Sequence, residues 1–273
     1  MDASPEFPRQ SRVPVFNMPG VVTLSIGLLM AIQAVRAFLL PDTLDIQVVL
    51  DLALVPARWT VWFDPDKAVD VIRAAAGAGD ADMEAAREAF ARYIVSEHAL
   101  QPWTLVTYAL LHGSWMHVVF NSVWLAAFGS PVARRCGAWR YGAIALAGTA
   151  AGGVLHVLID PLSAGPLVGA SAGISALMAA AARFVFQPPA SGYEGPPWQL
   201  PPRRPVETIP ELLRNRTAVA FLAIWLVTNL LFGLVSVPLV AENAAIAWDA
   251  HLGGFIAGFL LFPLLDPRDR VRR

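Results

Sequence analysis

Four polar side chains that could together perform acyl-transfer chemistry lie within long apolar stretches of the sequence. Ser171 is the centre of Gly-Ala-Ser-Ala-Gly, and His251 lies in Ala-His-Leu-Gly-Gly. His117 and Asn121 are four residues apart, a spacing that places both on one face of a helix. A serine becomes a nucleophile when a histidine serves as its base, and histidine and asparagine side chains can donate hydrogen bonds to an oxyanion. These residue types predict hydrolysis of an acyl bond, such as a peptide bond.

Each of these side chains has an ordinary explanation when it is considered alone. A serine or asparagine within a membrane span commonly packs on, or hydrogen-bonds to, a neighbouring helix. We interpret His156 in that way, and Ser175, one turn after Ser171, is a rival nucleophile that we place second. Four strongly polar residues on three apolar segments, however, are costly in lipid and favour a functional site.

The stretch before Ser171 predicts how this serine is presented. Residues 161–170 are apolar but rich in Pro and Gly, so we expect a non-helical segment that ends where a helix begins at Ser171. The free N–H groups and the dipole at a helix start favour negative charge, and Gly169 permits a close approach of the backbone. Non-helical backbone at membrane depth is tolerated where it lines a wet cavity, so water is expected to reach Ser171.

The predicted base, His251, is followed by glycines. Gly254 and Gly258 form a small-x-x-x-small pattern, which allows two helices to approach closely, as a contact between serine and histidine on different spans requires. Asp249 lies two residues from His251 and therefore faces elsewhere, so we interpret it as a solvated boundary residue. His112 is predicted at the outer mouth of the site, in a supporting hydrogen-bonding role.

Composition indicates that these residues belong to a polytopic membrane protein. The chain has 273 residues, of which 56% are hydrophobic and 15% are charged, whereas a soluble domain has about 25% charged residues. Its mean hydropathy is +0.53. Six apolar segments are long enough, or nearly so, to cross about 30 Å of hydrocarbon as helices. They are residues 21–40, 105–128, 142–159, 161–186 (with a clean helical pattern from 171), 217–237 and 244–265.

Basic residues predict the orientation of the spans. Arginines lie before the first segment, between the second and third, at or between the fourth and fifth, and after the sixth, while the long first loop is net acidic. The positive-inside rule then places both termini in the cytoplasm. The predicted organisation is a cytoplasmic tail (1–20), a membrane domain (21–265) containing a large external loop (41–103) and a Pro-rich cytoplasmic loop (187–216), and a basic tail (266–273). Within the external loop, which we interpret as a cap on the outer leaflet, residues 81–95 predict one amphipathic helix with Met83, Phe90 and Ile94 on one face.

Several classes of function are disfavoured by the sequence. The net charge of −1 indicates no basic surface for nucleic acid. The single cysteine, Cys136, supplies neither an internal disulfide nor a thiolate metal site, and we interpret it as a loop residue. The sequence has no His-Glu-x-x-His zinc motif, and its apolar segments have essentially none of the carboxylates that a proton-driven transporter uses. We therefore expect no metal and no cofactor, and place a channel or transporter as a distant alternative.

The motifs resemble those of the rhomboid family of intramembrane serine proteases over about residues 21–265. The resemblance rests on His-Gly-Ser-Trp-Met-His-Val-Val-Phe-Asn at 112–121, Gly-Ala-Ser at 169–171 and Ala-His-Leu-Gly-Gly at 250–254, in the family's order and spacing. It implies an all-α membrane protein, a six-helix rhomboid-like bundle with a large external first loop. It also implies a dyad of Ser171 and His251, an oxyanion hole formed by His117, Asn121 and the Ser171 N–H, and supporting roles for Gly169, His112 and Gly254.

Four positions depart from the family pattern. Ala172 follows the serine where a glycine is usual, and Ser175 stands where an aromatic ring often packs on the histidine, so we expect His251 to be held less firmly. Trp103-Thr104 replaces a Trp-Arg pair, and Ile246 replaces a glycine. These changes concern helix packing more than the chemistry.

The implied function is cleavage of transmembrane protein substrates near the external face of the bilayer, without ATP or metal. From the composition we expect a bacterial inner membrane, with a multi-pass chain whose termini are both cytoplasmic. The alternative is a catalytically weak or inactive rhomboid-like protein that binds transmembrane clients; retention of both Ser171 and His251 favours the enzyme.

Overall fold

A computed structural model describes residues 18–77, 83–97, 99–187, 205–234 and 247–267 of the chain. Most of the predicted N-terminal tail, most of the Pro-rich loop, the last residues of the fifth segment, the first residues of the sixth segment and most of the basic C-terminal tail lie outside these residues. The described part is built from helices. They are α1 (Gly20–Phe38), α2 (Asp42–Leu52), α3 (Pro56–Phe63), η1 (Pro65–Lys67), α4 (Ala68–Ala76), α5 (Glu84–Ser96), α6 (Thr104–Thr107), η3 (Tyr108–Leu110), α7 (Trp115–Trp124), η4 (Leu125–Gly129), α8 (Ser130–Cys136), α9 (Ala138–Ile159), α10 (Ser171–Val185), α11 (Ile209–Arg214), α12 (Arg216–Leu234) and α13 (Trp248–Leu265).

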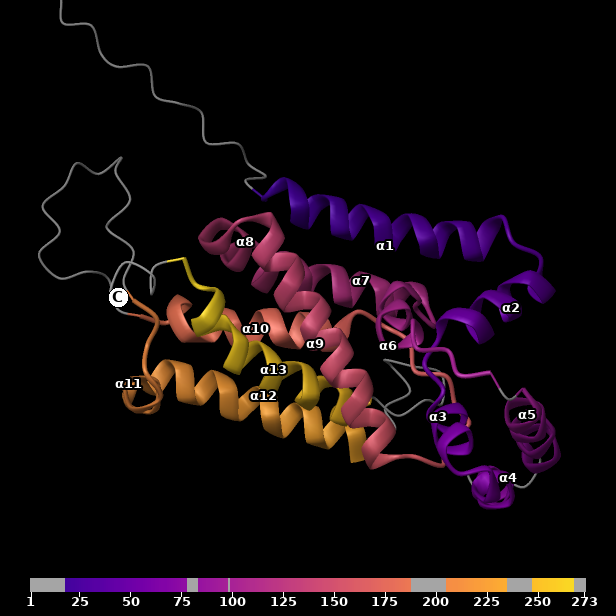
Figure 1. The fold of residues 1–273 in the computed structure, drawn as a ribbon. Coiled ribbons are helices and arrows are strands. Elements are labelled where there is room, and N and C mark those ends of the chain that lie inside the picture. The colour runs from indigo at the N-terminus through magenta and orange to yellow at the C-terminus, as the bar shows by residue number, and fades with distance from the viewer. Residues whose placement is uncertain (1–17, 78–82, 98, 188–204, 235–246, 268–273) are drawn as a thin grey trace, which may run out of the picture.

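Four helices of the described residues are long and apolar enough to cross a membrane. They are Gly20–Phe38, Trp115–Cys136, Ala138–Ile159 and Trp248–Leu265. Two shorter apolar helices, Ser171–Val185 and Arg216–Leu231, coincide with the predicted fourth and fifth segments. Figure 1 shows these helices side by side in one bundle, with α1 along its outer edge. The chain is therefore an all-α, multi-pass membrane protein, as predicted, and the number of six spans stays a prediction.

The second apolar segment differs from the expectation of one helix over residues 105–128. It begins with the short helices α6 and η3, and the chain is extended at Leu111 before α7 begins at Trp115. The hydroxyl of Ser114 accepts a hydrogen bond from the N–H of His117 at 3.1 Å and so caps α7. From α7 the helix continues through one π-helical turn into α8. It therefore ends later than predicted, and Cys136 is a buried helical residue rather than a loop residue.

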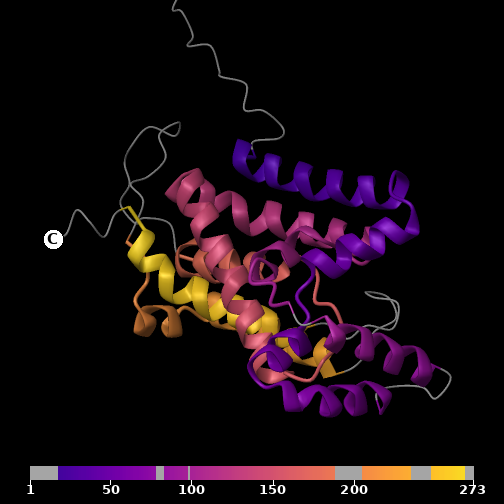
Figure 2. The same cartoon turned by 45° about the vertical axis from the view of Figure 1, so that its right-hand side comes forward.

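Small residues hold the centre of the bundle together. Gly254 and Gly258 of α13 lie against α10: a Cβ added to them would lie 2.0 Å from the carbonyl oxygen of Ala172 and 2.1 Å from that of Ala176, respectively. The two helix backbones are thus in direct contact, and α9 packs on both. Figures 1 and 2 show α9, α10 and α13 crossing at the middle of the molecule. The small-x-x-x-small prediction for α13 is confirmed.

The first loop forms a structured cap at one end of the bundle. Where the sequence predicted one helix, the described residues contain α2, α3, α4 and α5, and the last three lie together beyond the ends of the spans in Figures 1 and 2. A separate apolar cluster joins these helices, including Val61, Val71 and Ile94. Ile94 of α5 is buried, whereas Met83, the residue before α5, is 57% exposed, so the predicted common face is not buried as a whole.

The opposite end of the bundle contains a buried ion pair. Arg135, one of the arginines between the second and third predicted segments, lies on α8 and contacts Asp266 at 2.6 Å, and both side chains are buried. Its guanidinium also lies over the rings of Phe184 and Phe262. Arg135 therefore joins α8 to the end of α13, and its charge is compensated within the protein.

Candidate active site

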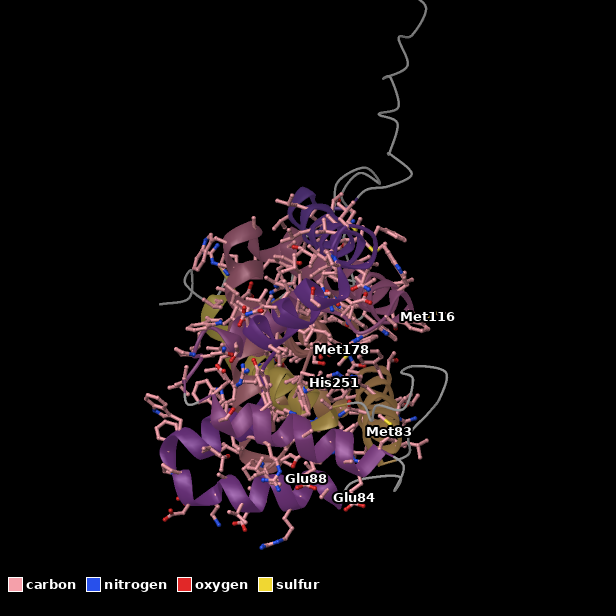
Figure 3. The ribbon with its side chains drawn as sticks, turned by 90° about the vertical axis from the view of Figure 1, so that its right-hand side faces the viewer. Met83, Glu84, Glu88, Met116, Met178 and His251 are labelled. Atoms are coloured by element: carbon pink, nitrogen blue, oxygen red, sulfur yellow. The ribbon has the colours of Figure 1, made fainter. Side chains whose placement is uncertain are left out.

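Ser171 and His251 are in hydrogen-bonding contact. The Nε2 atom of His251 lies 2.7 Å from the Oγ of Ser171, and the two side chains come from α10 and α13. Figure 3 shows His251 towards the middle of the outline, whereas Glu84 and Glu88 of the cap lie at its edge. A serine and a histidine in this geometry are the minimal arrangement for a nucleophile and its general base.

The contact between α10 and α13 explains why these two side chains meet. Gly254 is three residues after His251, and it lies on the carbonyl of Ala172, the residue after the serine. The methyl group of Ala172, which replaces the family's usual glycine, faces α9: a Cβ added to Gly152 would lie 2.6 Å from it. Gly152 therefore leaves the space that Ala172 occupies, and α10 keeps its close approach to α13.

The segment before Ser171 is non-helical, as predicted, and it is tied to the rest of the protein. The N–H of Gly169 donates to the carbonyl of Tyr108 at 3.0 Å, and Leu167 pairs with Leu54 of the cap in an isolated antiparallel bridge. Gly169 has a φ of +120°, a conformation that favours glycine. A Cβ at this position would also lie 2.8 Å from the ring of His117. The cap and Gly169 thus place the start of α10 against α7.

His117 and Asn121 reach the same region from α7. A Cβ added to Gly169 would lie 3.7 Å from the Nδ2 atom of Asn121, so both side chains lie beside the backbone two residues before Ser171. The Nδ2 atom of Asn121 is buried and has no hydrogen-bond partner among the described residues. A buried donor without a partner is costly, and this one lies beside the backbone two residues before Ser171.

His112 lies behind His117 rather than at an open mouth. It is 1% exposed, and its ring packs edge-on to that of His117, with ring centroids 4.9 Å apart. Its carbonyl oxygen accepts from Arg36 of α1 at 2.9 Å. His112 thus restricts the ring of His117 through a direct contact, and its predicted hydrogen-bonding role stays a prediction.

Ser175, the rival nucleophile, is buried in α10 one turn after Ser171. The hydrogen bond to His251 is made by Ser171. Ser175 stands where an aromatic ring often packs on the histidine, and one turn after His251 on α13, Phe255 stacks on Trp225 of α12 with ring centroids 4.7 Å apart.

Asn229, which none of the sequence motifs indicated, completes the contacts of His251. The Oδ1 atom of Asn229, on α12, lies 2.7 Å from the Nδ1 atom of His251. Asn229 is 6% exposed and lies within the fifth apolar segment. The criterion that selected Asn121, a strongly polar side chain within an apolar run, applies equally to Asn229 and would have found it.

The sequence suggested that Asp249 is a solvated boundary residue, and this prediction is wrong. It is 4% exposed, and both its carboxylate oxygens lie 3.0 Å from the Nδ1 atom of His156 on α9. The prediction that it faces elsewhere than His251 is consistent with this contact. A carboxylate in the span is retained because His156 and the N–H of Ala250 bind it.

Comparison with known proteins agrees with this arrangement. The Rhomboid domain family model matches residues 99–268, more than half of the chain. A stretch of 78 residues is 36% identical to Rhomboid-related protein 2 of Mus musculus; it makes up 29% of this chain and 25% of that protein, so the match spans about a quarter of the relative's length. With α7, α10 and α13 all inside the matched region, the chain belongs to the rhomboid family.

Proposed function

We propose that the protein is an intramembrane serine endopeptidase that uses Ser171 as nucleophile and His251 as general base. The observation that carries this proposal is the 2.7 Å contact between the Oγ of Ser171 and the Nε2 of His251. The Nδ2 of Asn121 beside Gly169 supports it: this atom has no hydrogen-bond partner within the described part of the chain, and a donor there suits an oxyanion.

In the proposed reaction, Ser171 Oγ attacks the carbonyl carbon of the scissile peptide bond while its proton passes to His251 Nε2. The carbonyl oxygen becomes an oxyanion that accepts hydrogen bonds from His117, Asn121 and the N–H of Ser171. Collapse of this intermediate breaks the C–N bond, and His251 gives its proton to the leaving amine. A water molecule deprotonated by His251 then hydrolyses the acyl-enzyme and regenerates the serine.

The proposed substrates are transmembrane proteins, cut near the external face of an inner membrane. The position of the site supports this: the start of α10 is tied to the cap helices through Leu167 and Leu54, at the cap end of the bundle. The net acidic first loop and the basic residues between the other segments support cytoplasmic termini.

Labelling with a fluorophosphonate and cleavage of a transmembrane substrate in detergent test the proposal. We expect the parent to be labelled at Ser171 and to cleave, whereas Ser171→Ala does neither. Ser175→Ala is the matched control, since it removes a hydroxyl one turn away on the same helix, and it should keep both activities. Cleavage by Ser171→Ala at the parental rate would exclude the assigned nucleophile. A folded parent that neither labels nor cleaves, but retains transmembrane clients, would favour the inactive rhomboid-like alternative.

A further inference from the structure

We propose that Asn229 is a positioning residue that completes a hydrogen-bonded series Ser171–His251–Asn229 and holds His251 ready to accept the serine proton. The inference rests on the proposed function and assigns a role to an α12 residue. It starts from two contacts of one amide: Oδ1 with the Nδ1 of His251 at 2.7 Å, and Nδ2 with the carbonyl oxygen of Trp248 at 3.0 Å.

The direction of every hydrogen bond in this series follows from the Trp248 carbonyl, which lies at one end of it. The carbonyl of Trp248 can only accept, so the Asn229 atom beside it is the NH2 donor, and the Oδ1 atom must face His251. An amide oxygen only accepts, so the Nδ1 of His251 carries a proton. Neutral His251 then has its lone pair on Nε2, which accepts from the hydroxyl of Ser171. This is the tautomer that a general base requires.

The packing of α12 on α13 places Asn229 at this position. One turn before Asn229, the ring of Trp225 stacks on Phe255, with centroids 4.7 Å apart. One turn after it, Gly233 lies against the Trp248 side chain, since a Cβ at Gly233 would be 2.4 Å from that ring. Asn229 is thus the middle of three successive contacts between the two helices. The preceding side chain, Thr228, is exposed, whereas Asn229 is buried on the side of α12 that faces α13.

The chemistry of an amide suits this role. The Oδ1 atom accepts from Nδ1–H whether His251 is neutral or protonated, so the ring keeps its orientation through the proton transfer. Asn229 carries no charge, and the nearby carboxylate, Asp249, is bound to His156 on α9 instead. The orientation of His251 is therefore set by a neutral group from α12.

The tautomer can be measured on the parent protein. With 15N-labelled histidine in detergent, at a pH where His251 is neutral, we expect its Nδ1 to be the protonated nitrogen; His251→Ala identifies the signal. A neutral His251 protonated at Nε2 would overturn the inference. This measurement needs no variant of Asn229 and no turnover.

Kinetics of three α12 variants test the consequence. Asn229→Leu keeps the size of the side chain but removes the acceptor, and we expect kcat and the rate of fluorophosphonate labelling to fall about tenfold or more with little change in KM. Asn229→Asp keeps an oxygen acceptor for Nδ1 but loses the NH2 that binds the Trp248 carbonyl, so it should recover only part of the loss. Thr228→Val, one residue away and exposed, should match the parent.

The outcomes separate the two proposals. If the parent is labelled at Ser171 and Asn229→Leu is labelled equally fast, the inference on Asn229 is wrong while the protease assignment stands. If a smaller folded fraction, measured by thermal unfolding in detergent, accounts for the whole loss of rate in Asn229→Leu, Asn229 has only a packing role, and the inference is again overturned. A parent that is not labelled at Ser171 contradicts both.

Discussion

The polar residues of the site divide into those that bind each other and those that are left for a substrate. Ser171, His251 and Asn229 form one hydrogen-bonded series, and His156 binds Asp249 beside it. Polar groups are retained in an apolar environment when they satisfy one another. The loose hold on His251 expected from Ser175 is compensated by these contacts, because Asn229 binds the ring from the side opposite the serine.

Asn121 is the residue whose substitution separates catalysis from stability most clearly. Its Nδ2 has no partner among the described residues, so Asn121→Ala should leave the melting temperature nearly unchanged. If this donor binds the oxyanion, kcat should fall by about two to three orders of magnitude. Ser122→Ala is the control, since it removes the hydroxyl that binds the carbonyl of Val118 on the same helix. Activity of Asn121→Ala within a few-fold of the parent, in folded protein, would remove Asn121 from the oxyanion hole.

At the scale of helices, the site depends on how closely three backbones approach. Ser171 begins α10 and His251 lies in the first turns of α13, so a small displacement between these helices separates the hydroxyl from the imidazole. The distance between these helices is set by glycines at the contact. The chief ones are Gly254, which lies against Ala172, and Gly152, which lies against α10 and α13. Interiors packed this closely have little room to accommodate an added methyl group.

A methyl group added at Gly254 should therefore act on both folding and catalysis. Gly254→Ala places its Cβ 2.0 Å from the carbonyl oxygen of Ala172 unless the helices separate. We expect a loss of stability of about 1–3 kcal/mol and a lower rate of fluorophosphonate labelling. The control is Gly142→Ala on α9, where nothing lies within 4 Å of an added Cβ; alanine is the better helix former by about 0.5–1 kcal/mol. Thermal unfolding in detergent compares them, and equal melting temperatures would contradict this packing.

For the whole molecule, the cap is coupled to the site by the backbone. The bridge between Leu54 and Leu167 and the bond from Ala57 N–H to the carbonyl of Ser163 at 2.9 Å connect the cap to the segment that leads to Ser171. The cap therefore restrains the start of α10, in addition to its predicted role as a cover on the outer leaflet. The cap and α11 lie at opposite ends of the bundle in Figure 1.

The proposed orientation predicts which of these ends faces the outside of the cell. In a Cys136→Ser background, Asp70→Cys in the cap should react with a membrane-impermeant maleimide on intact bacterial cells. Leu213→Cys on α11, where the leucine is 68% exposed, should react only after the cells are lysed. Lysed cells serve as the control for reactivity of both cysteines. The reverse pattern would show that the positive-inside assignment is wrong for this chain.

Much of the architecture and the site could be predicted from the sequence because lipid restricts what a span can contain. The long apolar segments indicated membrane helices, and the Pro- and Gly-rich stretch before Ser171 indicated a non-helical segment ending at a helix start, which the structure confirms. The order of the His117, Ser171 and His251 motifs indicated the rhomboid family, which the family match confirms. These features are local, so composition and spacing were sufficient.

Contacts between segments far apart in the chain were decided only by the tertiary structure. Asn229 and His251 are 22 residues apart and His156 and Asp249 are 93 apart, and no local pattern joins them. The helix break before Trp115, the buried Arg135–Asp266 pair and the four-helix cap likewise depend on neighbours from other elements. The apolar segments alone indicated that a serine and a histidine lie in hydrophobic helices; the packing of α9, α12 and α13 around α10 decided their contact and the groups that orient the histidine.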